Sequence, residues 1–276
     1  MTGATGSISL PSLAAPGRVT QARVVRSEWT KLFSLRSTRW SLLVAVLLTI
    51  GLPLLFAAVT SSHWGSMSPH DRADRHPLDI ALAGVNLSQL AIGVLGVLVI
   101  TGEYSTGMIR ASLTAVPKRL PILWGKAAVF AVTTVVLMLP SVFIAFFGSQ
   151  AILSKHDILQ ISVSHPGVTR TIVGGAVYLM LLGIFTLALG TIVRNTAGAI
   201  AAFAAIFFVI PPLLNILPTS WNNAISPYLP DAAGRSIFSL THGSQSLGPG
   251  AGLALFVGYC AAALVIAALV LLRRDA

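Results

Sequence analysis

The chain has 276 residues, of which 55% are hydrophobic and 9% charged, and its formal net charge is +10. This composition lies outside the range of soluble domains and indicates a membrane protein. In a soluble chain the positive charge would suggest nucleic-acid binding, but a basic stripe with interleaved aromatic residues is missing, so we expect no nucleic-acid partner.

The first twenty residues, 1–20, are polar, contain proline and glycine, and have no apolar core of the kind found in signal peptides. We therefore predict a disordered tail for this segment. A cleavable signal within the first apolar run is not expected, because that run is too long for one.

Residues 21–40 predict an amphipathic helix that lies on the membrane surface. The apolar face comprises Ala22, Val25, Trp29, Leu32 and Phe33, and the basic complement comprises Arg26, Lys31, Arg36 and Arg39. Such a pattern is typical of an interfacial helix on an anionic leaflet, with Trp40 as an aromatic anchor. The alternative interpretation is a basic flank that only fixes the topology.

Residues 41–276 predict one all-α membrane domain of six transmembrane helices. A spanning helix needs about 20 mostly apolar residues, and such runs occur at 41–60, 80–100, 123–148, 171–193, 196–217 and 250–272. The single cysteine, Cys260, excludes an intrachain disulfide. The six histidines lie between these runs at irregular spacing, so no metal site is expected.

The distribution of charge predicts the orientation. With both termini on one side, that side holds thirteen of the eighteen lysines and arginines and three acids, whereas the other side holds five basic and five acidic residues. The positive-inside rule therefore places both termini in the cytoplasm of a multi-pass protein of the plasma (inner) membrane.

A polar segment, TGEYSTGMIRASLTAVPKRLPILWGK at 101–126, follows the second apolar run. Tyr104 and Met108 begin an apolar stripe with helical spacing, so we predict a short cytoplasmic helix with Glu103 in its first turn and Pro117 at its end. A solvated loop that only sets the topology is the alternative.

Four polar residues in or next to the spans are candidates for a substrate path: Asn86, Ser88, Gln89 and Asn215. The alternative is that they hydrogen-bond neighbouring helices and hold them together. A path with no counter-ions would suit a lipophilic or amphiphilic cargo, such as a drug, lipid or peptide.

Three segments together resemble the membrane subunit (permease) of ABC-2 type ABC transporters, especially actinobacterial ones. They are VVRSEWTKLFSLRSTRWSLL before the first span, the 101–126 segment, and ISPYLPDAAGRSI at 225–237. In the second segment the resemblance is carried by Gly102, Glu103, Gly107, Arg110, Pro117, Arg119 and Lys126.

The resemblance implies a coupling helix at 102–119 that docks onto a separate P-loop ATP-binding subunit, beside the N-terminal amphipathic helix. The residues it implies for coupling are Gly102, Glu103, Tyr104, Gly107, Met108, Arg110, Pro117 and Arg119, with Glu103 and Arg110 as charge contacts and Gly107 for close backbone approach. A separate set of site residues, Arg26, Glu28, Trp29 and Lys31, belongs to the N-terminal helix that packs beside the coupling helix. The resemblance also implies re-entrant external helices between spans five and six, and a dimer interface involving spans one and five. A homodimer is the first choice of assembly.

The chain contains no G-x-x-x-x-G-K-[ST] phosphate loop, so it should not hydrolyse ATP by itself. We expect no enzyme activity and no cofactor on this chain, with ATP and Mg²⁺ on the partner subunit. The function expected from the resemblance is that of an exporter permease working by alternating access. The alternatives are a secondary carrier or channel, and a membrane anchor or sensor that recruits a cytoplasmic partner.

Overall fold

The computed structural model describes residues 20–73, 75–108, 120–154, 160–240 and 246–273. These residues are helical or irregular, and none of them lies in a strand. The predicted tail at 1–20 falls outside the described residues except for Thr20.

Within the described residues, six helical segments are long and apolar enough to cross a membrane, which agrees with the predicted number of spans. They are formed by α2 (Arg36–His63), α4 (Pro77–Ser105), α6 (Leu120–Ser154), α7 (Val168–Val193), the α8–α9 segment (Thr196–Leu214) and α12 (Pro249–Arg273). The chain is therefore a multi-span helical membrane protein. Most of these helices extend a few residues beyond the predicted apolar runs, because the backbone hydrogen bonds of the helix continue past the apolar part.

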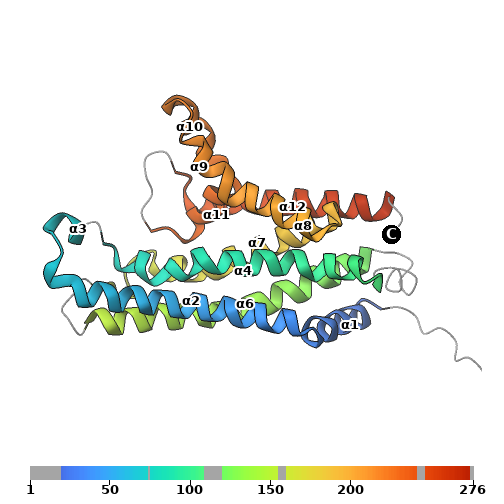
Figure 1. Cartoon of the computed structure of the whole chain (residues 1–276), viewed down its shortest axis with the longest axis horizontal. Coiled ribbons are helices and arrows are strands. Elements are labelled where there is room, and N and C mark those ends of the chain that lie inside the picture. The colour runs from blue at the N-terminus through green and yellow to red at the C-terminus, as the bar shows by residue number, and fades with distance from the viewer. Residues whose placement is uncertain (1–19, 74, 109–119, 155–159, 241–245, 274–276) are drawn as a thin grey trace, which may run out of the picture.

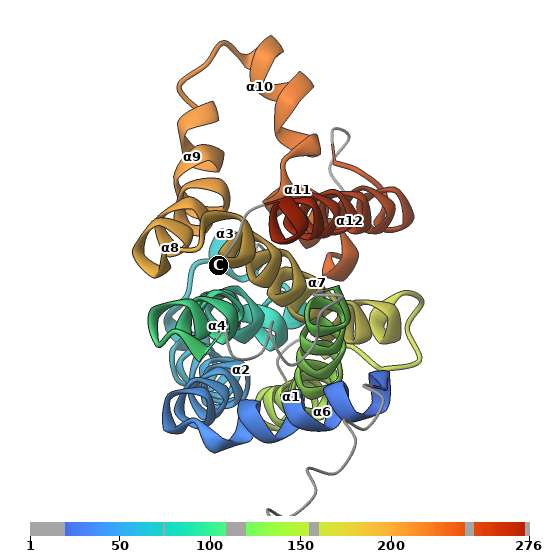
Figure 2. The ribbon, with the colours of Figure 1, turned by 90° about the vertical axis from the view of Figure 1, so that its right-hand side faces the viewer.

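Helix α7 occupies the centre of the bundle and is the most buried of the six spans. Helices α4, α6 and α12 pack against it, and α2 packs on α4 and α6 at the other side (Figure 2). Glycines allow α4 to approach α7 closely, since a Cβ atom at Gly96 would lie 2.6 Å from the carbonyl oxygen of Gly183.

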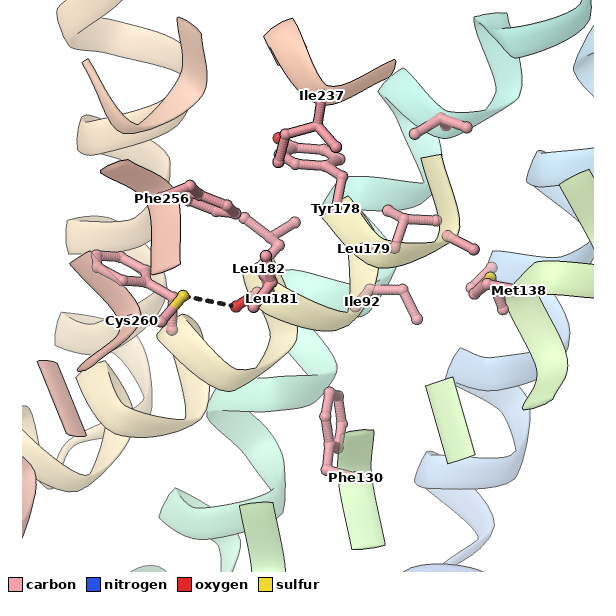
Figure 3. Packing of buried hydrophobic residues seen from close by; sticks show 14 of the residues in the cluster. Ile92, Phe130, Met138, Tyr178, Leu179, Leu181, Leu182, Ile237, Phe256 and Cys260 are labelled. Carbon is pink, nitrogen blue, oxygen red and sulfur yellow. Dashed lines mark hydrogen bonds between the residues drawn. The ribbon is translucent and has the colours of Figure 1, made fainter. Parts of the chain in front are cut away.

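The core around α7 is almost entirely apolar (Figure 3). Tyr178 is fully buried between Phe238 and Phe256, and its hydroxyl donates a hydrogen bond to Oε1 of Gln89 on α4. On the α12 side, the thiol of Cys260 donates to the carbonyl oxygen of Leu181 at 3.3 Å. The Tyr178 hydroxyl on α7 and the Gln89 amide oxygen on α4 thus satisfy each other's hydrogen-bonding capacity in the core.

The N-terminal amphipathic helix, α1 (Gln21–Ser34), is shorter than predicted. Leu35 has extended backbone angles (φ −80°, ψ 123°), and α2 begins at Arg36, so the predicted end at residue 40 is wrong. The predicted apolar face of α1 is buried only in part. Leu32 is buried and Val25 and Phe33 are half-buried, whereas Ala22 and Trp29 are exposed, and Val24 and Glu28 are the other buried residues.

The fifth span is not a single straight helix. It comprises α8 (Thr196–Ala204), a π-helical turn (Ala205–Val209) and α9 (Ile210–Leu214). Pro211 and Pro212 have no backbone N–H to donate, so the hydrogen-bond ladder of the preceding turn cannot continue regularly through them. As a result α9, together with the following α10 (Thr219–Ile225), projects away from the bundle (Figures 1 and 2).

Short helices occur between spans five and six, where the resemblance implies re-entrant external helices. They are α10 and α11 (Pro230–Phe238), joined by a 3₁₀ turn (Ser226–Tyr228). Helix α11 packs on α7 and α12, whereas α10 exposes Trp221. The described part of the loop between α2 and α4 contains a 3₁₀ turn (Trp64–Ser66) and a short α-helix, α3 (Pro69–Ala73) (Figure 1).

Candidate functional site: a buried charged junction of three helices

Four charged side chains from three helices meet at the end of the bundle where α1 lies. Glu28 and Lys31 come from α1, Glu103 from the last turn of α4, and Lys126 from the second turn of α6. We call these four residues the charged junction. Figure 1 shows α1 and the adjoining end of α4 at the same end of the bundle.

Each lysine of the charged junction contacts both glutamates. The Lys126 ammonium lies 2.6 Å from Oε2 of Glu28 and 2.9 Å from Oε1 of Glu103. The Lys31 ammonium lies 2.7 Å from Oε1 of Glu28 and 3.2 Å from Oε1 of Glu103. The two ammonium groups therefore tie α1 to α4 and α6 by charge-assisted hydrogen bonds.

The charged junction is largely removed from solvent. The side chains of Glu28 and Lys126 are each 4% exposed and that of Glu103 is 6% exposed, whereas Lys31 keeps 27%. Buried charges persist only where they are paired and hydrogen-bonded. The two glutamates and two lysines of the charged junction are paired with one another and so meet that requirement.

Local packing brings α1 against the start of α6. Gly125 leaves room for Val24, whose methyl carbon would lie 3.1 Å from a Cβ atom at that position. The Gln21 amide donates to the carbonyl oxygen of Pro121 at 3.2 Å. A glycine directly before Lys126 thus allows α1 to lie close enough for Glu28 to reach the lysine.

The position of Glu103 differs from the prediction. It lies in the last turn of α4, near the negative end of the helix dipole, and not in the first turn of a separate helix. That position is unfavourable for a carboxylate on its own, so the two lysines supply the stabilisation that the helix end does not.

Lys31 remains positively charged in this setting. Burial lowers its pKa, but the hydrogen bond to Glu28 and the negative charge of Glu103 outweigh burial, and the pKa is raised above its usual value of 10.5. Because the folded-state pKa is raised, the ion pairs of Lys31 stabilise the fold. Their contribution is fully present below pH 10.5 and is lost as the pH rises through the folded-state pKa.

A cavity of about 300 Å³ opens beside the charged junction. All four charged residues line it, and the rest of its wall is mostly apolar, with Leu35 from the α1–α2 break, Val99 from α4 and Val129 from α6 among the lining residues. Oε2 of Glu103 is buried and has no hydrogen-bond partner among the described residues.

The other described residues predicted for coupling lie in the last turn of α4 or just after it, and only Gly102 and Met108 among them line the cavity. Tyr104 lies under the guanidinium of Arg194, which is 5.3 Å from its ring centroid, and the exposed Met108 lines the cavity. Gly107 has a left-handed backbone (φ 71°), and a Cβ atom at this position would have no described atom within 4 Å. It therefore serves the turn after α4, and the close approach to a partner subunit that the resemblance implies stays a prediction. Gly102 has free space around it and accepts hydrogen bonds from Ser105 and Thr106.

Three further residues predicted for coupling, Arg110, Pro117 and Arg119, lie outside the described residues. In α1, Arg26 and Trp29 are exposed and take no part in the charged junction, and the Trp29 ring packs on Phe33 at 4.9 Å. The four residues predicted for α1 therefore divide into two that build the junction and two that remain on the surface.

The residues predicted for a substrate path do not gather at one place. Ser88 shares a hydrogen bond with Thr49 at 2.7 Å, and Gln89 accepts from Tyr178, so both hold neighbouring spans together. Asn86 accepts from Arg235 of α11 at 2.6 Å. Asn215 is exposed and accepts from Asn222 at 3.3 Å.

The sequence interpretation placed Lys126 in the family-like pattern but did not predict its burial or its partners. A lysine inside the apolar run ILWGKAAVF is a signal that could have been used, because ionisable groups at such positions face the bundle and pair with one another. Among the described residues, no three histidine, cysteine or acidic side chains gather as metal ligands would.

The fold and the charged junction define a multi-span helical membrane protein with a buried ionic link at one end of its bundle. Neither the protein-family models nor the curated proteins give a match to this chain.

Proposed function

We propose that the chain is the permease subunit of an ATP-driven exporter of the ABC-2 type, powered by a separate P-loop ATPase. The observation that carries this proposal is the charged junction. It joins the N-terminal helix α1 to the end of α4, the same two segments whose sequences resemble those of ABC-2 permeases.

In this proposal the charged junction transmits movement between the ATPase and the spans. A partner that pushes on the segment after Ser105 acts on the end of α4, and Glu103 passes the displacement to α1 and α6 through Lys31 and Lys126. Three helices joined in this way shift as a unit, because separating any one of them leaves a buried charge without its partner. Both termini are then cytoplasmic, in the plasma membrane.

Co-purification tests the partner. The tagged chain is extracted in mild detergent from its native membranes, and the proteins recovered with it are identified and quantified by mass spectrometry. The wild type is compared with Glu103→Ala/Arg110→Ala. A matched control, Asp231→Ala/Arg235→Ala, also removes one acid and one arginine, but on α11.

We expect a P-loop ATPase in about equimolar amount with the wild type and the control, and its loss from the Glu103→Ala/Arg110→Ala variant. Thermal unfolding of each purified variant shows whether the loss reflects misfolding. Recovery of no ATPase with the wild type from several detergents contradicts the proposal and favours a carrier or a membrane anchor.

The fifth span supports the expected second permease subunit. It is the least buried of the six spans, and its exposed side chains include Ala197, Ala201 and Val209. We propose single-cysteine variants at these positions in a Cys260→Ala background, with the buried Ala199 as control. Oxidative crosslinks at the exposed positions but not at Ala199 are expected for a homodimer, and their absence at all three positions contradicts it.

The cargo proposed for this exporter is lipophilic or amphiphilic. Ser88 and Gln89 already satisfy neighbouring helices, and the described part of the span interiors around α7 is apolar. Stimulation of ATP hydrolysis in the reconstituted complex by hydrophobic drugs or lipids, but not by charged small solutes, is the expected result. A complex stimulated only by charged solutes contradicts this choice of cargo.

A further inference from the structure

We propose that the start of α2 is a binding site for an anionic phospholipid of the surrounding bilayer. The site is a surface recess of about 460 Å³ lined by Arg36, Arg39, Trp40 and Leu43. The proposal depends on α2 being a membrane span and does not depend on the exporter function.

The first observation is that these residues share one exposed face of α2. Arg36, Arg39, Trp40 and Leu43 follow the i, i+3, i+4, i+7 spacing of a single helix face, and Leu47 continues this face by one turn. All five side chains are exposed, Trp40 to 65% and Leu47 to 59%. The sequence prediction assigned both arginines to the amphipathic helix on the membrane surface, whereas the structure places them at the start of the first span.

The second observation is unmatched positive charge. Among the described residues, neither Arg36 nor Arg39 forms an ion pair. Of the three acids predicted for this side of the membrane, Glu28 and Glu103 already bind the lysines of the charged junction, and Asp275 directly follows two arginines. The two guanidinium groups therefore favour an anion from the surroundings, and a phosphate group suits them because guanidinium binds its oxygens by paired hydrogen bonds.

The third observation is that the recess lies where a polar end of a span meets its apolar part. Arg36 is the first residue of α2, at the end of the bundle where α1 lies (Figure 1). Trp40 is of the residue type that anchors spans at the level of the lipid headgroups. Beyond it, Leu43 and Leu47 continue the same exposed face toward the middle of the span. A lipid in this position has its phosphate beside the arginines and an acyl chain beside the leucines.

The combination of charge and apolar surface selects the class of ligand. A soluble anion or an acidic protein segment would use the arginines but leave the leucines uncovered. A zwitterionic lipid carries its own cation and brings no net charge to balance two arginines. An anionic phospholipid meets both requirements, since basic residues at the membrane surface attract anionic headgroups.

Photolabelling of the purified full chain in phosphatidylcholine nanodiscs tests the proposal. The nanodiscs contain a trace of one of two probes, phosphatidylglycerol or phosphatidylcholine, each with a diazirine in the same acyl chain. Labelled residues are mapped by mass spectrometry. Labelling by the glycerol probe divided by labelling by the choline probe gives a selectivity ratio at each position. Val132 and Val136, exposed on α6, serve as reference positions.

We expect a selectivity ratio of about ten at Leu43 and Leu47 and of about one at the reference positions, because each arginine near the headgroups strengthens the binding of an anionic lipid several-fold. Excess glycerol 3-phosphate should leave the labelling unchanged, because it has no acyl chain to cover the leucines.

Variants assign the selectivity to the two arginines. Arg36→Gln/Arg39→Gln should lower the ratio at Leu43 and Leu47 to about one. Arg36→Lys/Arg39→Lys keeps the charge but not the paired hydrogen bonds, so it should retain more of the ratio than the glutamine pair does. The control Arg26→Gln/Arg273→Gln removes two exposed arginines from α1 and α12 and should leave the ratio within about twofold of the wild type.

Four results overturn the proposal. Equal ratios at the leucines and at the reference positions in the wild type show that lipids contact α2 without selection, and this comparison decides even if a variant fails to fold. A ratio unchanged in Arg36→Gln/Arg39→Gln shows that the arginines do not select the lipid. Equal ratios in the lysine and glutamine pairs contradict selection by charge. Loss of labelling with excess glycerol 3-phosphate shows that the recess binds a soluble phosphate ester and needs no acyl chain.

Discussion

The molecule contains two polar clusters that differ in burial and in the number of helices they join. The charged junction combines two acids and two lysines from α1, α4 and α6, and three of its four side chains are almost fully buried. The second cluster, which we call the α11 cluster, comprises Asn86 of α4 with Asp231 and Arg235 of α11. The side chain of Arg235 is 40% exposed there.

Because of this difference, removing one partner of an ion pair or hydrogen bond should cost different amounts of stability in the charged junction and in the α11 cluster. In the α11 cluster, water can replace part of what a lost partner provided, so single substitutions should cost little. In the charged junction, water has little access, and a lost partner leaves a charge buried and unpaired. Substitutions in and between the two clusters test this comparison, from the largest expected effect to the smallest.

Lys126→Met should be the most destabilising. It keeps the length of the side chain but leaves Oε2 of Glu28 without its 2.6 Å partner, and we expect a loss of about 3–5 kcal/mol in the free energy of unfolding. Lys31→Met should cost less, because Lys126 still contacts both glutamates. Denaturation by SDS titration in mixed micelles measures both values.

The double variant Glu28→Gln/Lys126→Met serves as the control for charge. Removing both members of a buried ion pair is often near neutral, so the double variant should recover most of the loss. A double variant as unstable as Lys126→Met alone contradicts the unpaired charge as the cause and points to lost packing.

Helix α4 carries a residue of each cluster, Asn86 and Glu103, and Gly96 tests how closely this helix packs on α7. A Cβ atom at Gly96 would overlap Oγ1 of Thr186 and lie 2.6 Å from the Gly183 carbonyl oxygen, so Gly96→Ala should cost about 1–3 kcal/mol. Gly102→Ala, on the same helix with nothing within 4 Å, should be neutral or stabilising by up to about 1 kcal/mol. Equal effects of the two alanines in the same unfolding assay would rule out steric contact as the reason.

The spans were predictable from the sequence because length and apolarity alone define a membrane helix. The irregular features were harder to predict. The break at Leu35 has no proline or glycine to signal it. The π turn before Ile210 precedes two prolines, but the prolines alone do not predict a π-helical turn.

The charged junction was predicted in part. Glu103 was predicted as a charge contact of the coupling helix, and Glu28 and Lys31 as residues of the N-terminal helix beside it, but no contact among the three was predicted. The structure shows that they contact one another and Lys126. Periodicity could not reveal these contacts. It treats every charged residue as part of the polar surface, which places Glu28 on the exposed face of α1. The partner of Glu28 comes from α6, and only the tertiary packing brings the two together.

Asn86→Ala should destabilise the protein less than Lys126→Met or Gly96→Ala. It removes one hydrogen bond to a partly exposed guanidinium at 2.6 Å, so we expect a loss of about 1 kcal/mol. The same unfolding titration measures it. A cost as large as that of Lys126→Met would mean that the α11 cluster is as strongly isolated from water as the charged junction, and the comparison between them would fail.

Asp231→Asn should have the smallest effect at neutral pH and a characteristic dependence on pH. Burial raises the pKa of Asp231 above its usual value of 3.8, and the charge and hydrogen bond of Arg235 offset this only in part. Between 3.8 and the raised value the folded state binds more protons at this site than the unfolded state does, so stability increases as the pH falls through that window. The wild type should therefore gain stability relative to Asp231→Asn on acidification from about pH 7 toward about pH 4, as followed by unfolding titrations along the pH series. Asn86→Ala retains Asp231 and should follow the wild type, so a wild type that instead loses stability relative to Asp231→Asn would mean that Arg235 dominates over burial and that the α11 cluster behaves as a strong ion pair.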